Sequence, residues 1–232
     1  MILETKDLTK TYSRQGIEFD AVNGVDFSMD AGEIAILTGP SGCGKSTFFH
    51  LITGITNPTR GKVFLEGKEV TDLSSGEWAS VRAEKISYIL QGDSLLPNFT
   101  ILENICLPHR LAGLRKDLES SAMALLEEFG LQKMTQDYPA NLSGGEKRRV
   151  AIARAFVHDP LLVVADEPTS DLDEENTALI LDFFEKQRLQ GKAILISTHD
   201  RSCLRDGVTH YVMKKGIIER NENNGFRENQ RN

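Results

Sequence analysis

The stretch that decides the fold is Gly39-Pro40-Ser41-Gly42-Cys43-Gly44-Lys45-Ser46. It satisfies G-x-x-x-x-G-K-[ST], the pattern of a phosphate-binding loop, which requires a strand before it and a helix after it. Residues 34–38 form a continuous run typical of a buried strand, and residues 45–53 predict a helix that ends at Gly54. This context supports a phosphate-binding loop over a simple glycine-rich surface loop.

A triphosphate needs several hydrogen-bond donors at once, and a glycine-rich loop turns its backbone N-H groups inward while the helix N-terminus adds its dipole. Lys45 supplies a mobile charge for the outer phosphates, the Ser46 hydroxyl is placed to bind Mg²⁺, and Thr47 can touch an outer phosphate. We interpret Cys43 as a small spacer and not as a redox switch. The predicted nucleotide-binding residues of this segment are Gly39, Pro40, Ser41, Gly42, Cys43, Gly44, Lys45, Ser46 and Thr47.

Two carboxylates follow the apolar run 161–165. Because ligands of open α/β sheets bind at the carboxyl ends of the strands, both acids are expected at the nucleotide. Asp166 is predicted to hold Mg²⁺ through water, since this ion usually keeps several waters. Glu167 is predicted to orient and polarise the attacking water, because catalysis of phosphoryl transfer is mostly placement and charge stabilisation. An ordinary acidic turn after a strand is the alternative.

The rest of the chain predicts an α/β fold with a P-loop NTPase core. Residues 1–37 alternate apolar and polar positions, with turn signals at 14–16, 23–24 and 31–32, which predicts short antiparallel strands in an N-terminal β subdomain. Further strands are expected at 63–65 and 86–90. The continuous apolar runs 161–165 and 193–197 are typical of a mostly parallel sheet covered by helices. An inserted helical subdomain is expected over about residues 92–155. Its apolar stripe of helical period is Leu118, Ala122, Leu125 and Phe129.

Composition excludes several classes of protein. The 232 residues are 40% hydrophobic and 26% charged, as in soluble globular proteins, and no apolar run approaches the roughly 20 residues that span a bilayer. The start has no secretory signal pattern, so a cytoplasmic location is expected. Three scattered cysteines predict reduced thiols. A net charge of -7 argues against a nucleic-acid partner.

Leu142-Ser143-Gly144-Gly145-Glu146 resembles the signature of the ABC ATPase family. Ser143 and Glu146 have the spacing of a capping box, which predicts a second helix N-terminus able to bind an anion. The resemblance implies a head-to-tail homodimer with two ATP molecules. Each lies between the phosphate loop of one subunit and the signature of the other, so that Ser143, Gly145 and Glu146 bind nucleotide in trans.

Other positions match the family one by one, and their roles are those that the resemblance implies. Tyr12 matches the aromatic that stacks on adenine, Gln91 the glutamine that contacts Mg²⁺ and the attacking water, and His199 the histidine that touches the γ-phosphate. Residues 170–173 resemble the loop that crosses the dimer interface. A strand-surface tyrosine and a structural histidine are the alternatives. The expected catalytic residues are Lys45, Gln91, Glu167 and His199, and the expected metal ligands are Ser46, Gln91 and Asp166.

The resemblance covers residues 1–220, leaving a polar tail, 221–232, that is expected to be disordered. Leu95-Leu96-Pro97 and the absence of a C-terminal regulatory domain make the chain most similar to the lipoprotein-releasing and macrolide-efflux type. This implies an ATP-hydrolysing subunit that drives a separate membrane permease, for export or extraction of lipophilic cargo, on the inner face of the cell membrane. Lys147 and Asp171 depart from the family pattern, and one interpretation is that their opposite charges pair across the interface.

The permease is expected to dock near residues 91–99. The apolar side chains of Leu95, Leu96 and Phe99 are either packed beneath the helical insertion or exposed for docking, and we favour docking. The main alternative function is an ABC ATPase that moves nucleic acid, ribosomes or an assembly scaffold, but no second ATPase domain, coiled coil or basic extension is visible. A GTPase would need an Asn-Lys-x-Asp segment, which does not occur, and a non-catalytic module would be expected to lose Glu167 or His199.

Overall fold

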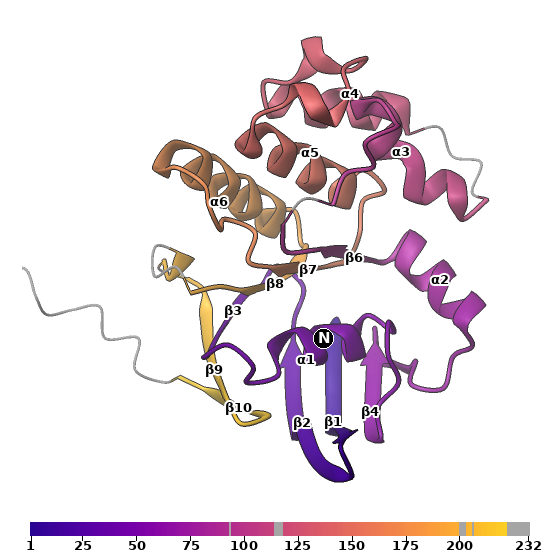
Figure 1. Cartoon of the computed structure of the whole chain (residues 1–232), viewed down its shortest axis with the longest axis vertical. Helices are drawn as coiled ribbons and strands as arrows, with labels where there is room; N and C mark the ends of the chain where they lie inside the picture. The colour runs from indigo at the N-terminus through magenta and orange to yellow at the C-terminus, as the bar shows by residue number, and fades with distance from the viewer. Residues whose placement is uncertain (93, 114–117, 200–202, 206, 222–232) are drawn as a thin grey trace, which may run out of the picture.

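The computed structural model describes residues 1–232 except 93, 114–117, 200–202, 206 and 222–232. Two β-sheets and two groups of helices make up the described chain (Figure 1). The disorder predicted for the tail falls almost entirely on residues outside this description. The α/β class, with an antiparallel sheet, a mostly parallel sheet and an inserted group of helices, is confirmed.

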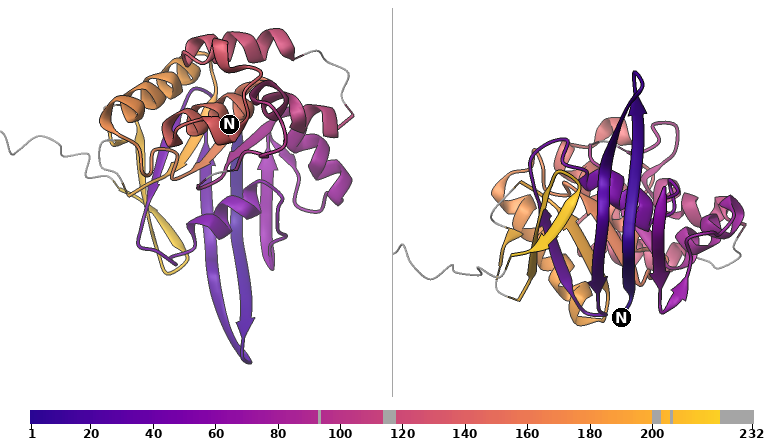
Figure 2. Two further views of the ribbon diagram at one scale, coloured as in Figure 1. Left: turned by 45° about the horizontal axis from the view of Figure 1, so that its top comes forward. Right: turned by 90° about the horizontal axis from the view of Figure 1, so that it is seen from below.

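The antiparallel sheet has the strand order β2-β1-β4-β5. Its strands are β1 (Leu3–Arg14), β2 (Ile17–Met29), β4 (Arg60–Leu65) and β5 (Lys68–Glu69). The predicted turn at 14–16 is present between β1 and β2, but the prediction of short strands is wrong for this hairpin. The turn predicted at 23–24 is not present, since these residues lie inside β2. The ladder with β1 continues past them, with shifts of register. The hairpin projects beyond the rest of the molecule (Figure 2).

The second sheet has the order β10-β9-β3-β8-β7-β6. Its strands are β3 (Ile34–Thr38), β6 (Ile86–Ile89), β7 (Leu162–Asp166), β8 (Ala193–Ser197), β9 (Thr209–Lys214) and β10 (Ile217–Arg220). All neighbours are parallel except β9 and β10. Every residue of β7 and β8 is buried, which is why these strands are continuous apolar runs. Their carboxyl ends, with that of β3, meet at one edge of the sheet.

Six α-helices are described: α1 (Lys45–Ile52), α2 (Ser75–Glu84), α3 (Ile101–Leu111), α4 (Glu119–Glu128), α5 (Gly144–Phe156) and α6 (Glu174–Leu189). Helices α3, α4 and α5 lie together on one side of the parallel sheet and form the predicted insertion (Figures 1 and 2). Short 3-10 turns at Gln132–Met134 and Pro139–Asn141 connect α4 to α5. Complete capping boxes begin α2, α3 and α5, so each helix start is fixed by its own sequence.

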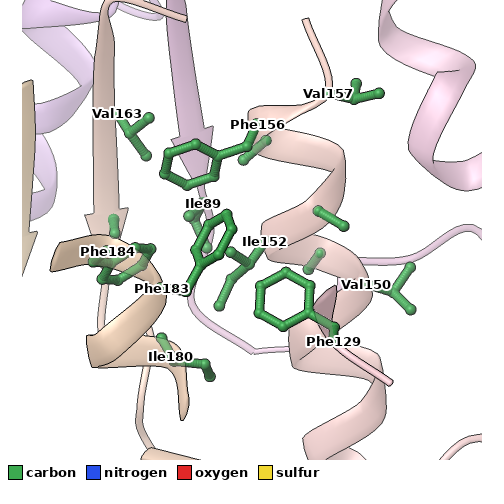
Figure 3. Close-up of a cluster of buried hydrophobic side chains, with 14 of the residues drawn as sticks. Ile89, Phe129, Val150, Ile152, Phe156, Val157, Val163, Ile180, Phe183 and Phe184 are labelled. Carbon is green, nitrogen blue, oxygen red and sulfur yellow. The ribbon is translucent and has the colours of Figure 1, made fainter. Parts of the chain in front are cut away.

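Two hydrophobic cores hold these layers together. One lies between the antiparallel sheet, α1 and the parallel sheet, and the other between the parallel sheet, α6 and the helical insertion. In the second, Phe183 of α6 contacts Phe156 of α5 edge to face, with ring centroids 4.9 Å apart, and also packs against Phe129 (Figure 3). Burial of each such ring stabilises the fold by about 1.5–3 kcal/mol. These rings fix the insertion on the sheet.

The predicted helical stripe is confirmed in this second core, where Leu118, Ala122 and Phe129 are buried and Leu125 packs against them. Cys43, Cys106 and Cys203 are free and buried. Among the described helices, none combines the length and apolar character needed to cross a membrane.

Candidate nucleotide site

A cavity of about 860 Å³ opens at the carboxyl edge of the parallel sheet, between the β1–β2 hairpin and the ends of β7 and β8. Of the predicted site residues, those that line it are Tyr12, Ser41, Gly42, Gly44, Lys45, Ser46, Thr47, Gln91, Asp166, Glu167 and His199. Gly39, Pro40 and Cys43 belong to the same loop without lining the cavity, and the three signature residues are also absent from its lining. One chain therefore brings together every predicted group except the signature.

The glycine-rich loop is held tightly against its surroundings. Gly44 precedes α1 with a φ of 115°, and a Cβ there would lie 2.0 Å from the Ala21 carbonyl oxygen of β2. A Cβ on Gly39 would lie 2.3 Å from the Met213 carbonyl oxygen of β9. Only glycine fits at either position. The Lys45 ammonium donates a 2.7 Å hydrogen bond to the Gly39 carbonyl oxygen, so the loop itself holds this charge.

Asp166, the last residue of β7, accepts hydrogen bonds from three hydroxyl groups. Ser46 donates at 2.8 Å and Tyr88 at 3.4 Å to Oδ2, and Ser197 donates to Oδ1. Burial raises the pKa of Tyr88, and the nearby carboxylate adds to this effect, so Tyr88 stays a donor. The Ser46 hydroxyl and the Asp166 carboxylate are oxygen donors of the kind that Mg²⁺ prefers.

No group of three or more His, Cys, Asp or Glu side chains among the described residues could hold a metal ion. The Ser46 hydroxyl and the Asp166 carboxylate, which are hydrogen-bonded to each other, would fit a cation that takes most of its ligands from water and substrate phosphates. Mg²⁺ is usually bound in that way, through one or two protein ligands.

Glu167 follows directly and is almost fully buried at the cavity wall. Its backbone has a φ of 51°, which is rare outside glycine, and its N-H donates a 3.0 Å hydrogen bond to the Ser197 carbonyl oxygen. The His199 Nε2 lies 3.2 Å from Glu167 Oε1, and the His199 backbone N-H donates to Oε2 at 3.4 Å. A strained backbone of this kind persists where the surroundings fix it, often at functional sites. The Glu167 carboxylate therefore lines the cavity, and His199 contacts both of its oxygens.

Gln91 reaches the cavity from the end of β6, and helix α5 holds the chain on both sides of it. Arg148 donates a 2.9 Å hydrogen bond to the Leu90 carbonyl oxygen, and Arg154 donates to the Ser94 carbonyl oxygen and hydroxyl at 2.9 and 2.7 Å. The segment that carries Gln91 is therefore tied to the helix that begins at the signature.

The prediction that Leu95 is exposed for docking is wrong. Leu95 is only 8% exposed and belongs to the core of the helical insertion, whereas Leu96 and Phe99 are 42% and 37% exposed. Periodicity could not separate these three residues, because they lie in a loop without regular structure. Only the two exposed side chains stay candidates for docking.

The signature forms the predicted capping box at the start of α5. The Glu146 carboxylate accepts a 2.8 Å hydrogen bond from the Ser143 N-H and a second bond from the Ser143 hydroxyl. These two bonds lower the pKa of Glu146. Ser143 is exposed. A Cβ on Gly145 would lie 2.9 Å from the Asn176 side chain of α6. Asn176 in turn hydrogen-bonds Asp173 and accepts a bond from Arg149, so the two helix starts are joined.

Sequence reasoning missed several residues of the site. Phe19, Ala21, Thr169 and Thr198 also line the cavity. Residues 170–172, which the resemblance assigned to the loop that crosses the dimer interface, line it too. Ser197 and Tyr88 hold Asp166 from neighbouring strands. Polar residues near the carboxyl ends of buried strands were a usable signal for Ser197 and Thr198. Nothing local marks Phe19, because only strand pairing places it beside Tyr12.

Comparison with known proteins gives a consistent result. A family model described as "ABC transporter" matches residues 22–170. An uncharacterized ABC transporter ATP-binding protein of Thermotoga maritima is 39% identical over 225 residues, which cover 97% of this chain and 96% of that protein.

Among solved structures, a dimeric post-hydrolysis state of the ATP-binding cassette MJ0796 bound to ADP and Pi is 32% identical with a TM-score of 0.87, covering 94% of this chain and 97% of that one. An ATP-binding subunit of an ABC transporter is 30% identical with a TM-score of 0.82, covering 95% and 90%. The chain belongs to the ABC transporter family, as an ATP-binding subunit and ATPase.

Proposed function

We propose that this subunit hydrolyses Mg²⁺-ATP in a head-to-tail homodimer and drives a separate membrane permease. The observation that carries the proposal is the division of the site within one chain. The phosphate loop, Asp166, Glu167 and His199 share one cavity, whereas Ser143 lies exposed at another helix start. A second copy can supply that helix start to the same nucleotide, and a two-fold arrangement closes on two subunits. The dimeric state of MJ0796 supports this arrangement.

In the proposed reaction, the loop N-H groups and the N-terminus of α1 bind the phosphates, and Lys45 exchanges its bond to Gly39 for an outer phosphate. Ser46, Asp166 and Gln91 would hold Mg²⁺, which when bound neutralises charge on the phosphates. Glu167 orients a water and accepts its proton as the water attacks the γ-phosphorus, and the bond to the β–γ bridging oxygen breaks to release ADP and phosphate. His199 holds the Glu167 carboxylate in place and reaches the γ-phosphate. Each of these groups lines the cavity.

Lys45→Ala tests the nucleotide site. We expect it to weaken ATP binding at least about tenfold, because a charged hydrogen bond to phosphate contributes about 1.5–3 kcal/mol. Lys68→Ala is the control, because Lys68 is an exposed lysine of β5 outside the cavity lining. The measurement is calorimetric titration with ATP in the presence of Mg²⁺. Equal affinity of the Lys45 variant and the unchanged protein would refute the proposed site.

For the permease, we propose docking at the loop that carries Leu96 and Phe99. Asn104 is fully buried and pins this loop, since its side-chain amide donates 3.0 Å bonds to the Leu96 and Phe99 carbonyl oxygens and its Oδ1 accepts a 2.8 Å bond from the Leu96 N-H. The loop is thus rigid while two large apolar side chains are exposed. A preorganised apolar surface loses little entropy on binding, which favours a docking role.

Leu96→Asp and Phe99→Asp should uncouple the subunit. We expect the isolated variants to melt within a few degrees of the unchanged protein and to hydrolyse ATP, but to bind the permease weakly and fail in transport. Leu111→Asp is a matched control, because Leu111 is also on the insertion and is 78% exposed. Leu95→Asp should instead unfold the insertion, since it buries a charge. Normal permease binding by both exposed-site variants would exclude this docking surface.

The further proposals rest on the resemblance of 95–97 to lipoprotein-releasing and macrolide-efflux subunits. We propose that the transporter exports or extracts lipophilic cargo. We also propose that the permease holds this subunit at the inner face of the cell membrane. Purification of the tagged subunit from membranes and identification of the copurifying permease tests both. A permease of the importer type would contradict the proposed direction.

A further inference from the structure

Phe19 is a large apolar side chain that is exposed without being at a tip or a terminus. It lies two pairs before the turn end of the β1–β2 ladder, where its Cα partner is Tyr12, and 49% of it is exposed. The two rings have centroids 6.1 Å apart and an interplanar angle of 38°, and both line the nucleotide cavity. An exposed apolar surface at the rim of a ligand cavity is typical of a binding contact.

The strand places Phe19 at the end of the cavity away from the phosphate loop. Ala21 and Phe19 are two residues apart on β2, and both line the cavity. Gly44 packs against the Ala21 carbonyl oxygen. Two residues of strand then carry Phe19 roughly 7 Å farther from that contact. Phe19 therefore lies farther from the phosphate loop than Ala21 does, where the base of a bound nucleotide would extend.

The position of the ring is fixed by the surrounding ladder. Thr11 and Asp20 are paired in the register next to Tyr12 and Phe19, and the Thr11 hydroxyl donates a 2.7 Å hydrogen bond to Asp20 Oδ1. The Lys10 ammonium lies 5.4 Å from the centroid of the Tyr12 ring and donates to the Asn57 carbonyl oxygen, which restrains that ring as well. Two aromatic surfaces are thus held side by side before any ligand arrives.

We propose that Phe19 is a second base-contacting residue, which with Tyr12 forms a two-ring surface for a purine base. The proposal rests on the proposed nucleotide site and extends it. Centroids 6.1 Å apart are already at the spacing of two rings in contact, so a base does not insert between them. It stacks on one ring and meets the other at an angle. A two-ring purine covers both aromatic side chains, whereas a one-ring pyrimidine covers less of them.

Phe19→Ala tests the proposal by comparing ligands with and without a base. Replacement of an aromatic ring that stacks on a base by alanine lowers the affinity about tenfold. We therefore expect the dissociation constant of Mg²⁺-ATP to rise about tenfold. The constant for CTP should rise less, and that for inorganic triphosphate should not change. Phe19→Tyr should restore the affinity for ATP. Because Phe19 is half exposed, the variant should melt close to the unchanged protein.

Ile17→Ala is the matched control, since Ile17 lies on the same strand, is 72% exposed and is outside the cavity lining. It should leave all three dissociation constants unchanged. An unchanged affinity of Phe19→Ala for ATP, or an equal loss for ATP and inorganic triphosphate, would overturn the role of Phe19. If the proposed nucleotide site itself were wrong, Lys45→Ala would not change the affinity for ATP, and this result would distinguish the two failures.

Discussion

Glu167→Gln should lower the ATP turnover number by about a thousandfold while leaving ATP affinity nearly unchanged, in line with the loss of a general base. The substitution keeps the size of the side chain and one oxygen acceptor, so the contacts to His199 can persist. It removes the negative charge that polarises the attacking water. Since the strained backbone at this position is the same for both residues, the fold should not change.

The trapped species of this variant should be a dimer that holds two ATP molecules. Size-exclusion chromatography with ATP and without Mg²⁺ should show the dimer, and single-turnover assays with Mg²⁺ should show the loss of chemistry. Glu174→Gln is the control, because Glu174 is an exposed carboxylate at the start of α6, outside the cavity lining. A monomer under every condition would count against the ATP sandwich, and normal turnover would show that another group activates water.

Most of the fold could be predicted because its strongest signals are local. The buried strands around 34–38, 161–165 and 193–197 are continuous apolar runs, and Gly39 and Asp166 directly follow the first two. The structure has each strand within a residue of its predicted bounds. Helix α2 was not predicted and α3 was predicted only as part of the insertion, although Ser74 with Glu77 and Thr100 with Glu103 have the same capping-box spacing that identified α5. This spacing is a local signal that marks the start of both helices.

The site was less predictable because tertiary contacts build part of it. Motifs located the phosphate loop and the paired acids, since each is a contiguous segment. Ser197 and Tyr88 meet Asp166 only because β8 and β6 flank β7 in the sheet. Leu95 and Leu96 are neighbours in sequence, and only the packing of the insertion decides that one is buried and the other exposed.

Ser143→Arg should abolish hydrolysis by the dimer while each chain still binds ATP. The side chain of Ser143 is outside the cavity of its own chain, so nothing at that cavity changes. The arginine removes the cap of α5, at a cost of about 1 kcal/mol. It also places a bulky group where the proposed partner's nucleotide meets the helix start. Gln132→Arg, at another exposed position of the insertion, is the control for the added charge and should keep full activity.

Mixing separates action in trans from simple damage to the chain. In a mixed dimer of Ser143→Arg with Lys45→Ala, the intact phosphate loop of the first chain meets the intact signature of the second, and one complete site forms. Random pairing of equal amounts makes about half of the dimers mixed, so about a quarter of the original activity should return if the two sites work independently. Each variant alone should stay inactive. If the signature acted within its own chain, both chains of the mixture would carry a defective site, and no activity would return at any ratio.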